Sequence, residues 1–136
     1  MKLFVLGTVV FILFIVCDLL WFQLAGNFFK SQVGSIARLN LDGSWNVLIL
    51  PALLAYVLMA IGVLFFVLPQ AQSVGQAAIL GALFGLVGYG LYDLTNLATL
   101  SAWTTSFAAV DMLWGTFLCA IVSAAAYGVR ALTFFS

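Results

Sequence analysis

Residues 81–114 read GALFGLVGYGLYDLTNLATLSAWTTSFAAVDMLW, and this stretch decides the fold. It is apolar enough to enter a membrane twice, on either side of a short polar loop, yet it contains Asp93, Asn96 and Asp111. A charged side chain near the middle of a bilayer is unfavourable by roughly 2.5–3.5 kcal/mol on insertion scales. Two carboxylates in such a stretch therefore need a structural or functional reason.

The composition of the whole chain points to the same environment. Of its 136 residues, 66% are hydrophobic and 6% are charged. A soluble domain usually carries about 25% charged residues, so lipid must cover much of this surface. We therefore expect membrane lipid as a partner and a single transmembrane domain over residues 1–136.

The composition also argues against several classes of ligand. No segment is rich in Lys or Arg, which makes nucleic acid an unexpected partner. Histidine is absent, which removes the commonest metal ligand and the usual haem ligand. We expect no bound metal and no cofactor.

Four apolar runs predict an all-α polytopic membrane protein, with four transmembrane helices in an antiparallel bundle. The first run follows Met1-Lys2, as in a signal peptide. It is too long for the apolar region of such a peptide and ends in no small-x-small cleavage site, so we expect a retained helix. Pro69 ends the second run. The spans lie at about residues 3–24, 47–68, 76–100 and 106–129.

The segment between the first two spans is the only sizeable polar one. Phe29, Val33 and Ile36 share one helical face there, with polar side chains elsewhere. This pattern is typical of a short amphipathic helix in the headgroup region, which we expect over residues 28–39. The segment would serve as an interfacial connector or, alternatively, as a lid over the polar residues.

Small residues mark the faces of the third and fourth spans. Gly81, Gly85 and Gly88 lie three or four residues apart, which allows another helix to approach closely. In the fourth span, small residues follow Asp111 at four-residue intervals, beginning with Gly115. Asp111 is therefore expected on the face that is turned into the bundle.

Three acidic residues are expected at one membrane level. Because four antiparallel spans put both termini on one side, Asp18, Asp93 and Asp111 each lie roughly 8–10 Å from the opposite side at 1.5 Å per residue. Three ionised carboxylates this close together in a low dielectric repel one another. We predict that one or two of them are protonated at neutral pH.

Two of these acids precede a tryptophan by three residues. The chain reads DLLW from Asp18 to Trp21 and DMLW from Asp111 to Trp114, so each pair occupies neighbouring positions on a helix. Trp114 lies too deep for the membrane surface and is expected in the core or in the wall of a pocket. The expected interfacial belt residues are Trp21, Trp45 and Trp103.

Hydroxyl and amide side chains near the same level complete a candidate site. Its residues are Asp18, Trp21, Tyr89, Tyr92, Asp93, Asn96, Asp111 and Trp114. One interpretation is a structural hydrogen-bond network that holds the helices together. The other is a binding site, because ionisable residues inside a membrane are usually functional.

The chain resembles the bacterial family of predicted membrane proteins called domain-of-unknown-function 2177. The segments that carry the resemblance are GALFG at 81–85, YDLTNLATL at 92–100, VDMLWG at 110–115 and DLLW at 18–21. The resemblance covers nearly the whole chain and implies a small four-helix inner-membrane protein, with no assigned activity. The sequence departs from the family at Ser101-Ala102, where a basic residue and a glycine are expected.

The orientation in the membrane is weakly marked. Lys2 and Arg130 flank the side of the termini, whereas Lys30 and Arg38 lie in the first loop, so positive charge is balanced. The short N-terminus favours both termini in the cytoplasm, for the multi-pass protein of the inner membrane that the resemblance implies.

Three classes of function stay open. The first, which we favour and which is not enzymatic, is binding or transport of a small cation, a proton or a lipid-like amphiphile at the acidic residues. The second is an intramembrane enzyme that acts on a lipid or isoprenoid by carboxylate acid/base chemistry, with catalytic residues that the sequence does not assign. The third is a non-catalytic assembly subunit that pairs through its glycine face, as a homo-oligomer or with another membrane protein.

Overall fold

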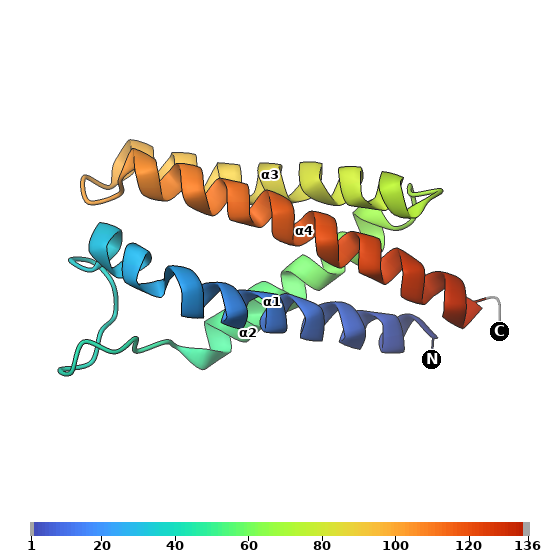
Figure 1. Ribbon diagram of the computed structural model, residues 1–136, viewed down its shortest axis with the longest axis horizontal. Coiled ribbons are helices and arrows are strands. Elements are labelled where there is room, and N and C mark those ends of the chain that lie inside the picture. The colour runs from blue at the N-terminus through green and yellow to red at the C-terminus, as the bar shows by residue number, and fades with distance from the viewer. Residues whose placement is uncertain (1, 135–136) are drawn as a thin grey trace.

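The computed structural model describes residues 2–134, with side chains up to residue 130. Neighbouring helices run antiparallel, and α1 begins at the same end of the bundle where α4 ends (Figure 1). The elements are α1 (Lys2–Val33), α2 (Ile49–Gly62), the π-helical turn η1 (Val63–Val67), α3 (Val74–Thr99) and α4 (Thr105–Phe134).

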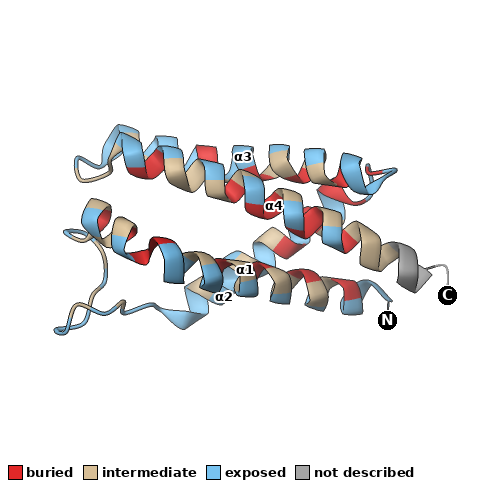
Figure 2. Ribbon diagram, viewed as in Figure 1, coloured by how far each residue is buried: buried red, intermediate tan, exposed pale blue. Residues whose placement is uncertain are grey.

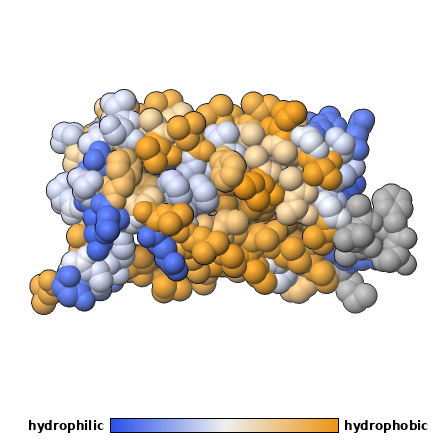
Figure 3. All heavy atoms as spheres, in the orientation of Figure 1, coloured by the Kyte–Doolittle hydropathy of each residue, from blue (hydrophilic) through white to orange (hydrophobic). Residues whose placement is uncertain are grey.

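The surface of the bundle suits a bilayer. Within the described residues, 4 helices are long and apolar enough to cross a membrane. Large hydrophobic side chains point outward along them, and buried residues form narrow inward stripes (Figure 2). Hydrophilic residues gather mostly at the two ends of the molecule, with hydrophobic residues between them (Figure 3). The predicted all-α membrane fold is confirmed.

The second span is one continuous rod built from two kinds of helix. Pro51 lies in the first turn of α2, where its missing N–H is tolerated. After Gly62 the helix widens into η1, and the N–H of Leu68 donates to the carbonyl of Val63, five residues earlier, at 2.9 Å. Pro69 follows directly, as expected from the sequence.

The separate amphipathic helix that we expected over residues 28–39 is not observed, because α1 continues to Val33. The inward stripe of α1 runs from Phe14 and Asp18 through Ala25 to Phe29 and Val33, with spacings of four or seven residues that keep these positions on one helical face. A glycine inside a helix costs only about 1 kcal/mol, so Gly26 does not end a helix whose packing face continues. Beyond α1, residues 34–48 form turns and irregular structure.

Helices α3 and α4 pack very closely, because glycines face each other across them. A Cβ on Gly85 would lie 2.3 Å from the carbonyl oxygen of Gly115, and one on Gly81 would lie 2.4 Å from that of Cys119. Gly88 differs: a Cβ there would meet nothing within 4 Å among the described residues. The glycine face proposed for an oligomer is therefore used within the chain at Gly81 and Gly85.

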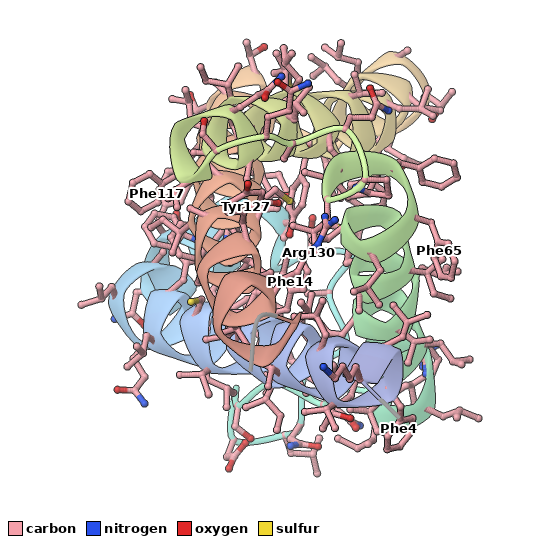
Figure 4. All side chains as sticks on the ribbon, turned by 90° about the vertical axis from the view of Figure 1, so that its right-hand side faces the viewer. Phe4, Phe14, Phe65, Phe117, Tyr127 and Arg130 are labelled. Carbon is pink, nitrogen blue, oxygen red and sulfur yellow. The ribbon has the colours of Figure 1, made fainter. Side chains whose placement is uncertain are left out.

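Apolar side chains fill the half of the bundle that contains the termini. Val10, Phe14 and Val63 pack there with Leu118 and Val122. In a view from that end, Phe14 and Arg130 lie between the helices, whereas Phe4 and Phe65 point outward (Figure 4). Arg130 Nη1 donates to the carbonyl of Leu68 at 2.6 Å, which joins α4 to the end of the second span.

Candidate ligand-binding site

The structure brings the three intramembrane acids together in the other half of the bundle, away from the termini. Asp18 comes from α1, Asp93 from α3 and Asp111 from α4. Asp18 and Asp93 are 6% and 0% exposed, and Asp111 is partly buried. Each carboxyl must therefore find partners inside the protein.

Asp18 is held by uncharged donors from two other helices. The indole Nε1–H of Trp114 donates to Asp18 Oδ1 at 2.7 Å. The Tyr56 hydroxyl, from α2, donates to the same carboxylate. Asp18 thus links α1 to α2 and α4 through uncharged donors.

Trp114 is also stacked on Trp21, the other tryptophan of the repeated Asp-x-x-Trp pattern. The ring centroids lie 4.5 Å apart and the planes differ by 5°. The Trp21 Nε1–H is buried and has no hydrogen-bond acceptor among the described residues. Trp21 therefore faces the interior of the bundle.

Asp93 is reached by the tryptophan of the loop between α3 and α4. Trp103 Nε1–H donates to Asp93 Oδ1 at 3.2 Å. The Trp103 ring packs edge-on against Tyr92 and Phe107, with centroid distances of 5.6 and 4.6 Å. Trp103 is therefore an inward-facing partner of the acid.

Asp93 and Asp111 lie against each other. The two carboxyl groups are close enough for a side-chain hydrogen bond. Asp93 Oδ2 is buried, and no donor reaches it in the described part of the chain when both groups are ionised. Two carboxylates have only acceptor oxygens, so this contact becomes a hydrogen bond when one proton lies between them.

A cavity of about 480 Å³ lies between the helices beside Asp18. Asp18 and Asp111 line it, and its walls include Trp21, Trp114 and Tyr56. An outer cavity of about 440 Å³ continues toward the loops. The residues common to both are Phe22, Phe29, Val47, Tyr92 and Asp111.

The loop after α1 forms the outer wall of this space. Leu39 pairs with Trp45 in a short antiparallel bridge, and Trp45 lines the outer cavity with Arg38. At the tip, the backbone N–H and the hydroxyl of Ser44 donate to Asp42 Oδ1 at 2.9 and 2.7 Å. These hydrogen bonds lower the pKa of the exposed Asp42 carboxyl.

The remaining predicted residues, Tyr89 and Asn96, lie on α3. Tyr89 lines the inner cavity beside Asp18, and its ring fills the space that a Cβ on Gly115 would take. Asn96 contacts Tyr92 from one turn further along α3. Neither Asn96 nor the fully buried Asp93 lines either cavity.

Tyr56 is a site residue that was not predicted from the sequence. The signal for it was weak but present, because Tyr56 carries the only hydroxyl in an otherwise apolar second span, residues 47–68. A buried tyrosine hydroxyl usually finds a hydrogen-bond partner. That rule directs attention to the acids of the neighbouring spans.

Comparison with known proteins identifies the chain as a membrane protein and goes no further. A family model described as Predicted membrane protein (DUF2177) matches residues 3–128. No curated protein and no solved structure matches the chain. The chemistry of the site must therefore be argued from its own residues.

Proposed function

The chain belongs to this family of predicted membrane proteins, and from that premise we propose that it binds a monovalent lipophilic cation between its helices. The observation that carries the proposal is that Asp18 and Asp111, acids from two helices, line one cavity walled by stacked tryptophans. An organic ammonium or phosphonium ion is the class of ligand that such a cavity favours.

The charge of the site supports a cation. The donors that reach Asp18 and Asp93 are indole and phenol groups, so these contacts do not neutralise the negative charge of an ionised carboxylate. In a low dielectric that charge attracts a cation strongly. A monovalent ion of low charge density is favoured over a small inorganic ion because it loses less hydration when it enters an apolar cavity.

The walls support a lipophilic ligand. Trp21 and Trp114 present stacked rings to the inner cavity, and Phe22 and Phe29 line both cavities. The face of an aromatic ring attracts cations, by about 2 kcal/mol or more when the contact is desolvated. Aromatic rings also bury the apolar groups of the ligand.

We propose that the ligand enters from the loop end, toward which the outer cavity continues. The apolar core around Phe14 and Leu118 fills the half with the termini. The structure therefore favours a binding state, and transport would require this core to open. With the termini in the cytoplasm, the cavity would open on the periplasmic side of the inner membrane.

The test uses two ions of the same shape and opposite charge. All 4 tryptophans of the chain are available as reporters, and each lines one of the two cavities. Purified protein in an uncharged detergent is titrated with tetraphenylphosphonium and, separately, with tetraphenylborate. Saturable quenching by the cation, and only non-saturable partitioning of the anion, is expected. Equal behaviour of the two ions would reject the proposal.

Two matched variants identify the site. Asp18→Asn removes the charge beside the inner cavity while keeping acceptor capacity, and it should weaken phosphonium binding about tenfold, which corresponds to about 1.4 kcal/mol. Asp42→Asn removes an exposed carboxylate in the loop and should leave binding unchanged. If both variants bind as the wild type does, the cation lies elsewhere.

A further inference from the structure

We propose that the contacting carboxyls of Asp93 and Asp111 hold a proton that is released when the cation binds, so that the site exchanges one positive charge for another. This inference rests on the proposed function and deepens it, because it names what the cation replaces. Asp111 is the exchanging group, and Asp93 is a positioning residue that acts through it.

The geometry separates the two carboxyls into different roles. Asp111 lines both the inner and the outer cavity, so a ligand can touch it. Asp93 is 0% exposed and lines neither cavity, so it can reach the ligand only through Asp111. Its Oδ2 atom has no donor in the described structure unless a proton joins it to Asp111.

Among the described residues, no side chain with a permanent positive charge contacts the pair. From α3, Tyr89 and Tyr92 face Asp111, and from α1 the Asp18 carboxylate acts on it as a further negative charge. Tyr56 of α2 donates to Asp18. Arg38 lies further out, in the wall of the outer cavity. A proton is therefore the simplest way to relieve the repulsion between Asp93 and Asp111.

The exchange balances in atoms and charge. Before binding, the pair consists of one carboxylic acid and one carboxylate that share a hydrogen bond. A cation that enters beside Asp111 and Asp18 stabilises both carboxylates, so the O–H bond breaks and the proton passes to water at the loop end of the outer cavity. The site takes up one positive charge and gives up one, and no oxidant or other reactant is needed.

The experiment measures protons and cations together. Tetraphenylphosphonium carries no titratable proton, so any proton that appears on binding comes from the protein. Binding to the full-length wild type is measured by calorimetry at neutral pH in phosphate and in Tris, whose ionisation enthalpies differ. Release of about one proton per cation is expected, with affinity that rises about tenfold per pH unit.

Asp93→Asn tests the partner residue. Asparagine can accept from Trp103 and donate to Asp111 without a titrating proton, so the variant should bind the phosphonium ion with no proton release and with affinity independent of pH. Asp18→Asn should still release the proton, at weaker affinity. Continued release from Asp93→Asn would contradict the inference, as long as circular dichroism shows native helix content.

The wild-type measurement alone separates the two proposals. Binding with proton release supports both. Binding with the same enthalpy in both buffers overturns the exchange and leaves the cation site standing. No binding of the phosphonium ion in either buffer overturns the proposed function, and the exchange with it.

Discussion

Trp114 of α4 donates its indole N–H to the carboxylate of Asp18 in α1 at 2.7 Å, across 96 residues of sequence. Asp18 is buried, so this hydrogen bond supplies its carboxyl with a donor inside the protein. The contact links the first and last helices at the level of the cavity. It therefore serves both the stability of the bundle and the shape of the site.

Trp114→Phe should lower the free energy of unfolding by about 1–3 kcal/mol, the range expected when a buried acceptor loses its donor. Trp21→Phe is the matched control, because it replaces the other ring of the same stack. The N–H of Trp21 has no acceptor in the described structure, so this variant loses no hydrogen bond. Unfolding by sodium dodecyl sulfate, followed by circular dichroism, measures both. Equal losses in the two variants would show that packing, and not the hydrogen bond, stabilises the bundle.

Gly85→Ala should destabilise the protein by about 1–3 kcal/mol, because the new methyl group would meet the backbone of Gly115. Gly88→Ala, one turn away on an open face, should be neutral or slightly stabilising, since alanine favours helix. The same unfolding assay compares them. A destabilised Gly88 variant beside a stable Gly85 variant would mean that α3 packs through a different face.

Gly115→Ala should weaken phosphonium binding as well as stability. A Cβ at Gly115 would lie 2.1 Å from Cγ of Tyr89, near the base of the ring, so the ring must move, and Tyr89 lines the inner cavity. Gly128→Ala, on the same helix with nothing within 4 Å of the new atom in the described structure, is the control. Fluorescence titration of both variants checks this, and full affinity in Gly115→Ala would place Tyr89 outside the binding wall.

Ser44→Ala should raise the pKa of Asp42 toward its ordinary value, because the Ser44 hydroxyl donates to that carboxylate. The folded loop prefers the ionised form, so this contact supports the loop at neutral pH and is lost as the pH falls through the lowered pKa of Asp42. An NMR titration of the Asp42 carboxyl carbon measures the change. An unaltered pKa would show that the backbone N–H of Ser44 alone is sufficient.

The convergence of the acids could be predicted from the sequence because it depends on two simple quantities. Helices that alternate in direction and rise 1.5 Å per residue place Asp18, Asp93 and Asp111 at one level once the spans are located. The small-residue stripe around Asp111 and Gly115 then predicted the inward face of α4. The first step requires no knowledge of how the helices are rotated, and the second derives the rotation of α4 from its own sequence.

The details that the sequence could not give depend on rotation and packing. The second span is apolar on every side, so its pattern did not show toward which of the acids the single hydroxyl, that of Tyr56, points. The rule that places tryptophans at the membrane interface concerns their depth and not the direction in which they point. Trp103 points inward, where its indole N–H donates to Asp93. The end of α1 at Val33 was not predicted, because an amphipathic pattern is the same whether the segment forms a new helix or continues the previous one.

The most direct measurement is an experimental structure with tetraphenylarsonium, whose arsenic atom is located by its anomalous scattering. If the cation binds where we propose, an arsenic peak is expected in the inner cavity, between the carboxyls of Asp18 and Asp111 and beside the ring of Trp114. A larger groove of about 670 Å³ between α1 and α2, lined by Phe4, Phe11 and Val57, offers apolar surface without acids. A peak in that groove alone would contradict the proposed cation site between Asp18 and Asp111.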